Sequence, residues 1–194
     1  MPALAGMLAL AAVSTPALAH PGHGAGGGLL AGFVHPFSGF DHFLAMIAVG
    51  VWAAQLGGRA VWAVPAAFMA LMALGAVLVL SAAGSFAAGG IESGVAASLL
   101  VLGLLVWRAQ RMPLSAAAAL VAWFGLFHGA AHGGELPQFA DPLRYALGFL
   151  VATALLHGAG VVVGVLLKRH APLLGDLAGA ATAAAGIVLL LGVR

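Results

Sequence analysis

Histidine and carboxylate residues form two short clusters in a chain of which only 6% is charged. The first cluster runs from His35 to His42 and includes Asp41, and the second runs from His128 through His132 to Glu135. Imidazole and carboxylate groups bind intermediate divalent metals such as nickel, cobalt and zinc. The chain has no cysteine, which excludes thiolate ligands and disfavours Cu(I) and iron–sulfur sites. The two clusters therefore predict a metal site.

Helical spacing brings the second cluster together. His128 and His132 are four residues apart, and Glu135 follows His132 by three. On a helix the two histidines are separated by a rise of about 6 Å, and all three side chains project from one face. Pairs of histidines at this spacing share one ion in helical zinc sites. We therefore expect His128 and His132 to be ligands, with Glu135 as a ligand or an orienting group.

The first cluster allows two interpretations. His35 and His42 are seven residues apart, so a regular helix would separate them by a rise of about 10 Å and turn Asp41 about 100° away. They can share an ion only if the backbone is irregular, which Pro36 and Gly39 permit and which membrane proteins tolerate beside a cavity. In a regular helix Asp41 would instead accept a hydrogen bond from an imidazole and orient it.

Composition assigns the chain to the integral membrane proteins. Of 194 residues, 63% are hydrophobic, and the mean hydropathy is +1.14. The formal net charge of +2 rests on so few charged residues that it gives no basic surface for nucleic acid. Apolar segments near the roughly 20 residues that a membrane helix needs predict an all-α protein with six transmembrane helices. The segments are 33–56, 61–83, 91–107, 113–133, 145–167 and 173–193.

The N-terminal region resembles a processed leader. Residues 1–19 contain an apolar run and end in Ala17-Leu18-Ala19, as a signal peptide with a small-residue cleavage site does. The alternative is an uncleaved first helix. Cleavage would leave residues 20–32 as a histidine- and glycine-rich periplasmic tail before a transmembrane domain over residues 33–194.

Positive charges predict the orientation. With the mature N-terminus outside, the inner loops hold five lysine or arginine residues and the outer side holds Arg144 and Arg194, as the positive-inside rule requires. Both termini would then be periplasmic, and both clusters would lie near the outer boundary. His157 would lie near the bilayer centre. Intramembrane ionisable residues are expensive, so these side chains indicate an ion path leading inward.

Glycines spaced four apart predict close helix packing. Gly125, Gly129 and Gly133 lie in one segment, and Gly160 and Gly164 lie in another. Small residues at this spacing let the backbones of two membrane helices approach closely. We therefore expect a compact helical bundle.

Other functions compete with transport. A metalloprotease of the helical zinc type needs a glutamate between its histidines, and residues 129–131 provide none, so we do not expect an enzyme. Facing histidines could hold the haem of an electron carrier. A metal sensor or an assembly partner would bind an ion without transporting it. The sequence leaves these haem-binding and metal-binding alternatives open, while the absence of a P-loop argues against ATP coupling within this chain.

The two clusters resemble the signatures of a known family. His35-Pro36-x-x-Gly39-x-Asp41-His42 and Phe127-His128-Gly129-x-x-His132-Gly133-x-Glu135 are similar to the motifs of the HupE/UreJ nickel/cobalt permeases. The resemblance implies uptake of Ni²⁺ or Co²⁺ across the bacterial inner membrane to supply hydrogenase, urease or cobalamin synthesis. It implies no permanently bound cofactor, and Zn²⁺ remains open as a cargo. The metal-binding residues expected from the motifs and from the inward path are His35, Asp41, His42, His128, His132, Glu135 and His157.

Overall fold

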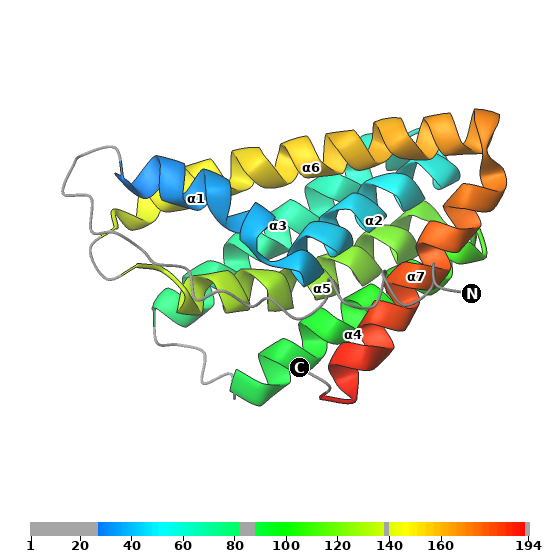
Figure 1. Ribbon diagram of the computed structural model, residues 1–194. Coiled ribbons are helices and arrows are strands. Elements are labelled where there is room, and N and C mark those ends of the chain that lie inside the picture. Colours follow the sequence, from blue (N-terminus) through cyan, green and yellow to red (C-terminus); the bar gives the residue numbers. More distant parts are fainter. Residues whose placement is uncertain (1–26, 82–87, 138–139, 193–194) are drawn as a thin grey trace, which may run out of the picture.

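The computed structural model describes residues 27–81, 88–137 and 140–192, and the predicted signal peptide lies outside these ranges. Within the described residues all regular secondary structure is helical. The elements are α1 (Gly27–Ser38), α2 (Phe40–Leu56), α3 (Ala60–Leu80), α4 (Ala88–Trp107), α5 (Leu114–Gly134), α6 (Pro142–His170) and α7 (Pro172–Leu190) (Figure 1).

The helices give the chain the dimensions of a polytopic membrane protein. Helices α3 to α7 each contain a stretch long and apolar enough to cross a bilayer, and α1 with α2 forms a sixth candidate span that is bent by 83°. The all-helical prediction is confirmed. The predicted continuous segment 33–56 is instead broken at Gly39, whose extended φ of −95° and ψ of 111° end α1 and begin α2. The backbone of the first cluster is therefore irregular, but His35 and His42 do not fall in one group of possible ligands, and Asp41 contacts the His42 imidazole as the second interpretation expected.

Helix α1 begins earlier than the sequence indicated. It starts at Gly27 and so includes residues 27–32, which we expected to belong to the periplasmic tail. Gly32 of this segment serves close packing. A Cβ at Gly32 would collide with the carbonyl of Tyr145 in α6, and a Cβ at Gly148 would collide with the carbonyl of Leu29 in α1. This contact holds α1 against the first part of α6.

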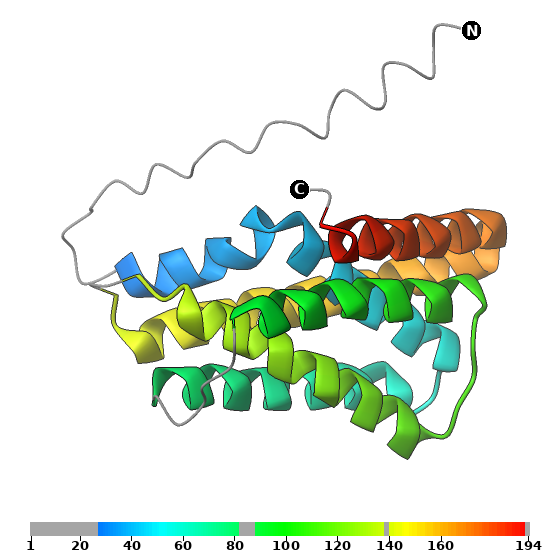
Figure 2. The same cartoon turned by 90° about the horizontal axis from the view of Figure 1, so that it is seen from below.

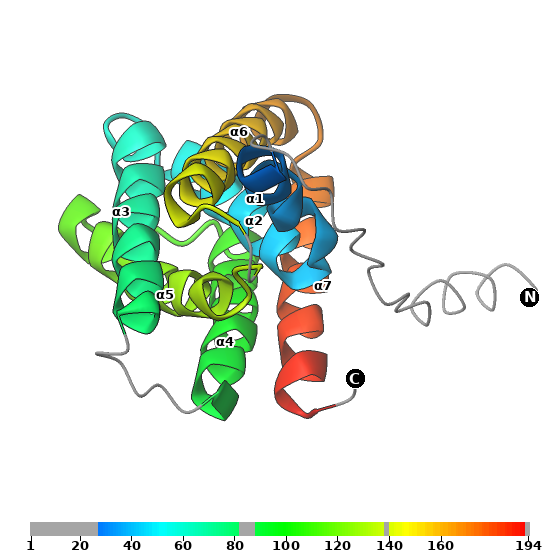
Figure 3. The same cartoon turned by 90° about the vertical axis from the view of Figure 1, so that its left-hand side faces the viewer.

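Glycine contacts join the remaining helices in pairs, as predicted. A Cβ at Gly129 of α5 would collide with the Met72 carbonyl of α3, and Gly50 of α2 faces Gly160 of α6. Helices α4 and α7 meet at Gly103, where a Cβ would overlap Ala183. The end-on view shows α3 beside α5 and α4 beside α7, with α6 across the top (Figure 3). The side chains of neighbouring helices therefore meet at short range in the interior.

The two ends of the bundle differ in charge. At one end the α2–α3, α4–α5 and α6–α7 connections come together, where Trp52 Nε1 donates to the Gln110 carbonyl at 2.9 Å and Gln55 Nε2 donates to the Val106 carbonyl at 3.0 Å. These connections hold most of the basic residues. The N-terminal parts of α1 and α6 lie at the opposite end with the C-terminal part of α5 (Figures 1 and 2). The basic residues at the first end are Arg59, Arg108, Arg111, Lys168 and Arg169.

Candidate metal centre

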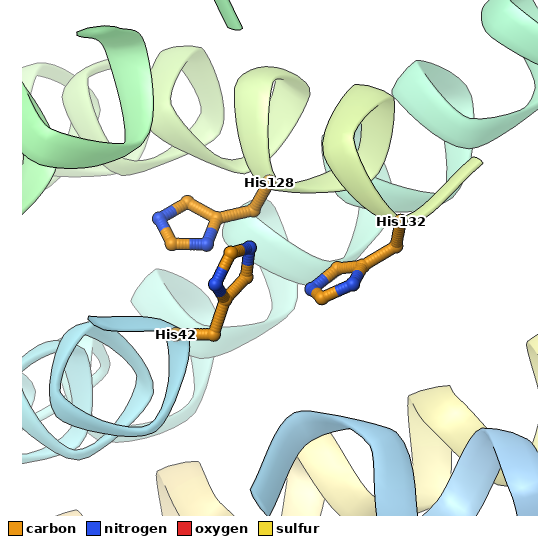
Figure 4. A group of neighbouring side chains, drawn as sticks. All are labelled: His42, His128 and His132. Carbon is orange, nitrogen blue, oxygen red and sulfur yellow. The ribbon is translucent and has the colours of Figure 1, made fainter. Parts of the chain in front are cut away.

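Two helices bring three imidazoles together inside the bundle. His42 comes from the first turn of α2, and His128 and His132 come from successive turns of α5. One ligand nitrogen from each ring lies within 4.8 Å of the other two, and all three residues are buried. The three side chains converge on a common point between the helices (Figure 4). We call His42, His128 and His132 the inner group.

The break at Gly39 positions His42. Asp41 Oδ1 accepts hydrogen bonds from the backbone N–H of His42 and from its ring Nδ1, both at 2.8 Å. The carboxylate therefore holds the imidazole proton on Nδ1, and the lone pair lies on Nε2, which is buried without a hydrogen-bond partner among the described residues. In this arrangement Asp41 contacts the back of the imidazole and orients it, as acidic partners of metal-binding histidines do.

His128 has a partner on a third helix. Its Nε2 lies 2.9 Å from the hydroxyl oxygen of Ser98 in α4, and the residue is completely buried. Its Nδ1 has no hydrogen-bond partner in the described part of the chain, and neither does Nε2 of His132. Buried polar atoms are nearly always paired, so several free imidazole nitrogens at one point indicate a ligand.

A second group lies beside the first and nearer the end of the bundle. Ligand atoms of His35, His132 and Glu135 also lie within 4.8 Å of one another. His35 Nε2 is 2.9 Å from Glu135 Oε2, and His132 Nδ1 is 3.4 Å from the same oxygen. The side chain of Glu135 is 53% exposed, whereas that of His132 is 4% exposed. We call His35, His132 and Glu135 the outer group.

The outer group keeps its carboxylate charged. Hydrogen bonding with His132 and then His35 holds the pKa of Glu135 well below its ordinary value, and this outweighs the opposing effect of partial burial. Glu135 therefore remains an anion in neutral and mildly acidic solution. A carboxylate next to two imidazoles attracts a divalent cation and supplies one hard oxygen ligand.

His132 belongs to both groups. A neutral imidazole has one nitrogen lone pair, so His132 can bind an ion in the outer group or in the inner group but not in both at once. The ring centroids of His132 and His35 are 4.8 Å apart, and those of His132 and His42 are 4.3 Å apart. The two groups therefore form adjacent positions joined by one side chain.

The distances fit an intermediate divalent ion after small side-chain movements. Metal–nitrogen bonds of about 2.1 Å place tetrahedral ligand atoms about 3.4 Å apart. The nitrogens of the inner group are within 4.8 Å of one another, so rotations that shift them by about an ångström would bring them around one ion. Their neutral charge and nitrogen chemistry suit Ni²⁺, Co²⁺ or Zn²⁺.

His157 of α6 lies apart from both groups. It is buried, and both ring nitrogens lack hydrogen-bond partners within the described ranges. Phe68 of α3 contacts both this ring and that of His128, with ring centroids 5.2 Å apart in each case. Among the predicted residues, the structure thus joins five as possible ligands and places Asp41 behind His42, while His157 belongs to neither group.

Sequence reasoning missed the residues that surround the imidazoles. Ser98, Phe68 and Phe149 each lie singly in an apolar run, so no spacing pattern identifies them. Ser98 contacts His128, and Phe149 packs against His132 with ring centroids 4.2 Å apart. Each comes from a different helix, and only the packing of α3, α4 and α6 around α5 brings them to the histidines.

The sequence as a whole is similar to a known protein family. Residues 8–189 match the family described as HupE / UreJ protein. The chain belongs to the HupE/UreJ family. It is also 44% identical over 185 residues to Protein HupE of Rhizobium leguminosarum bv. viciae, covering 94% of this chain and 95% of that protein. No solved structure matches the chain. Both groups described above are therefore built from residues of a HupE/UreJ protein, a family associated with nickel and cobalt uptake.

Proposed function

We propose that the protein is a permease that carries Ni²⁺ or Co²⁺ from the periplasm to the cytoplasm. The observation that supports this most strongly is the inner group, in which three buried imidazoles converge and leave ring nitrogens without partners. An ion held by neutral imidazoles inside a helical membrane bundle is more consistent with passage than with a folding role, because the glycine contacts already hold the helices together.

The proposed path begins at the outer group. Glu135 attracts the hydrated cation, and His35 and His132 replace part of its water shell. His132 then turns its lone pair toward the inner group, where His42 and His128 complete the ligand set. His157 of α6, whose ring contacts Phe68 as that of His128 does, is the proposed inner relay. A permease must release its ion, so each position binds with only moderate affinity.

The orientation follows from charge. We assign the end that holds Arg59, Arg111 and Lys168 to the cytoplasm by the positive-inside rule. On this assignment the proposal has the outer group and the mature N- and C-termini on the periplasmic side of a bacterial inner membrane. The cargo is expected to feed a metalloenzyme pathway, and hydrogenase, urease and cobalamin synthesis are the candidates that the family offers. No enzymatic step and no permanently bound cofactor is part of the proposal.

Haem binding is the main alternative, and the inner group argues against it. The three ligand nitrogens lie mutually within 4.8 Å, so a porphyrin inserted between any two imidazoles would overlap the third. The rings of His42 and His128 are in edge contact, with centroids 4.8 Å apart. A visible spectrum of the purified protein tests this alternative, since a Soret band after expression in haem-replete cells would support it.

Radioactive ⁶³Ni²⁺ uptake tests the proposed function. Cells that express the protein are expected to accumulate nickel in a saturable way above cells that carry the vector alone. Unlabelled Co²⁺ should compete strongly because its ligand preference is close to that of Ni²⁺, and Mn²⁺ should compete weakly because it prefers oxygen ligands. If the protein is present in the membrane and the cells accumulate neither nickel nor cobalt, the proposal is rejected. Competition by unlabelled Zn²⁺ shows whether Zn²⁺ is also a cargo.

The share of uptake that depends on Glu135 is expected to persist when the external pH is lowered from about 7.5 to about 5.5. Hydrogen bonding with His132 and His35 keeps the pKa of Glu135 well below its ordinary value, so its carboxylate stays ionised across this range. The ratio of the initial ⁶³Ni²⁺ uptake rates of the wild type and Glu135→Gln, measured at both pH values, checks this, and a ratio that falls to one at the lower pH would contradict it.

A further inference from the structure

Ser98 is the buried hydrogen-bond partner of His128. Its hydroxyl bears on which ring nitrogen of His128 carries the proton and which carries the lone pair. Ser98 lies in the middle of α4, is completely buried, and contacts His128 of the inner group. Its hydroxyl oxygen lies 2.6 Å from the Val95 carbonyl oxygen and 2.9 Å from Nε2 of His128. One hydroxyl proton must serve one of these two contacts.

The chemistry of the two neighbours decides where that proton goes. A carbonyl oxygen can only accept a hydrogen bond, and two oxygens 2.6 Å apart repel each other unless a proton lies between them. The Ser98 hydroxyl therefore donates to Val95. Its remaining lone pairs can only accept, so Nε2 of His128 must carry a proton and donate it to Ser98. The lone pair of His128 is then on Nδ1.

This assignment agrees with the rest of the inner group. Nδ1 of His128 is the buried nitrogen without a partner, and one nitrogen of this ring points toward His42 while the other points away (Figure 4). His42 is fixed in the opposite sense, because Asp41 holds its proton on Nδ1 and leaves Nε2 free. Two different partners on two helices therefore set opposite tautomers on two neighbouring rings.

We propose that Ser98 is a positioning residue that fixes the Nε2–H tautomer of His128 and thereby directs the Nδ1 lone pair to the transported ion. The proposal deepens the proposed function, since it takes His128 as a ligand of that ion. A neutral hydroxyl fixes the ring without adding a charge. Asp41 does the same for His42 with a carboxylate, which also makes its imidazole a stronger base.

The test compares the wild type with Ser98→Ala, using Thr182→Ala as the matched control. Thr182 is also buried, and its hydroxyl donates to the Ala178 carbonyl of its own helix at 2.9 Å, but it has no contact with the histidines among the bonds described. ¹⁵N-histidine NMR of the metal-free protein in micelles at about pH 8, where imidazole is neutral, reports which ring nitrogen of His128 bears the proton. The His128 signals are assigned by their loss in His128→Asn.

We expect the Nε2–H form of His128 in the wild type and in Thr182→Ala. In Ser98→Ala we expect a mixture of the two tautomers or the Nδ1–H form. Ni²⁺ titration of the purified proteins should give an affinity 10–100-fold weaker for Ser98→Ala and unchanged for Thr182→Ala, as is typical when the partner of a metal-binding histidine is removed. A wild-type Nδ1–H form would overturn the assignment even if Ser98→Ala fails to fold. Equal tautomers and affinities in all three proteins would overturn it too.

Failure of the proposed function is recognised separately. If the wild type does not bind Ni²⁺ or Co²⁺ at all, the permease proposal fails, whereas the tautomer of His128 in the metal-free protein still tests the role of Ser98. If the wild type binds Ni²⁺ and Ser98→Ala binds it equally well, the permease proposal stands and the role of Ser98 is rejected.

Discussion

Replacement of His132 by alanine is expected to abolish saturable ⁶³Ni²⁺ uptake. His132 contributes a ligand atom to both the outer and the inner group, so its loss leaves His35 with Glu135 on one side and His42 with His128 on the other. Two ligands hold an ion far more weakly than three. Removing only the hydrogen-bond partner of a metal-binding histidine weakens metal affinity by up to about 100-fold, so we expect loss of the ligand itself to weaken it by at least about 100-fold.

The comparison with His35→Ala makes the prediction specific. His35 belongs to the outer group alone, so this variant keeps the three imidazoles of the inner group. It should take up nickel with a raised half-saturation concentration and a nearly unchanged maximal rate. Initial rates across a range of Ni²⁺ concentrations separate the two variants. His170→Ala is the matched control, because His170 is exposed at the end of α6 on the basic side of the bundle.

Two outcomes would contradict this account of the two groups. If His132→Ala is present in the membrane at wild-type level and still transports nickel normally, neither group is the ion path. If His35→Ala is as inactive as His132→Ala, the outer group is essential and does not merely load the inner one. Retention of the His132→Ala protein is checked by fluorescence-detected size-exclusion chromatography, because a buried imidazole also fills space.

Gly160→Ala is expected to destabilise the bundle, and Gly158→Ala is not. A Cβ at Gly160 would collide with the Ile47 carbonyl of α2 and lie 3.0 Å from the Gly50 Cα, whereas a Cβ at Gly158 meets no atom within 4 Å. Both substitutions raise helix propensity by about 1 kcal/mol, so the contact with α2 is the difference between them. Overpacking of this kind costs about 1–3 kcal/mol.

The expected lowering of the melting temperature of Gly160→Ala in detergent is about 2–10 °C relative to the wild type and to Gly158→Ala. Displacement of α2 also moves His42, so nickel uptake should fall in the same variant. Equal melting temperatures for the two alanine variants would show that α2 and α6 are not held at this glycine contact.

Local chemistry explains what could be predicted from the sequence. Hydropathy and segment length identified a helical membrane protein. No water is present in the hydrocarbon to pair with backbone N–H and C=O groups, and a single segment can pair all of them only as a helix. The helical spacing of His128 and His132 placed them on one face, and the structure confirms it. The glycines four apart predicted the close helix pairs for the same reason, since spacing along a helix fixes which residues share a side.

The first cluster shows where local reasoning stopped. Pro36 and Gly39 made an irregular backbone possible, but periodicity could not choose between one helix and two. In the structure the chain bends by 83° between α1 and α2, with α1 against the start of α6 and α2 against its middle, and no spacing within residues 35–42 specifies this arrangement. The bend brings His35 to Glu135 and places His42 beside His128, although 100 residues of sequence separate the first pair.

Tertiary structure alone decided which imidazoles act together and what holds them. The residue types in the sequence predicted a transition-metal site, because histidine and carboxylate are poorly tolerated in hydrocarbon without a ligand or partner. Helix packing across the bundle decides that His132 belongs to two groups and that Phe68 contacts both His128 and His157. It also forms the hydrogen bond between Ser98 and His128. Such contacts join residues that are distant in sequence, so no local pattern records them.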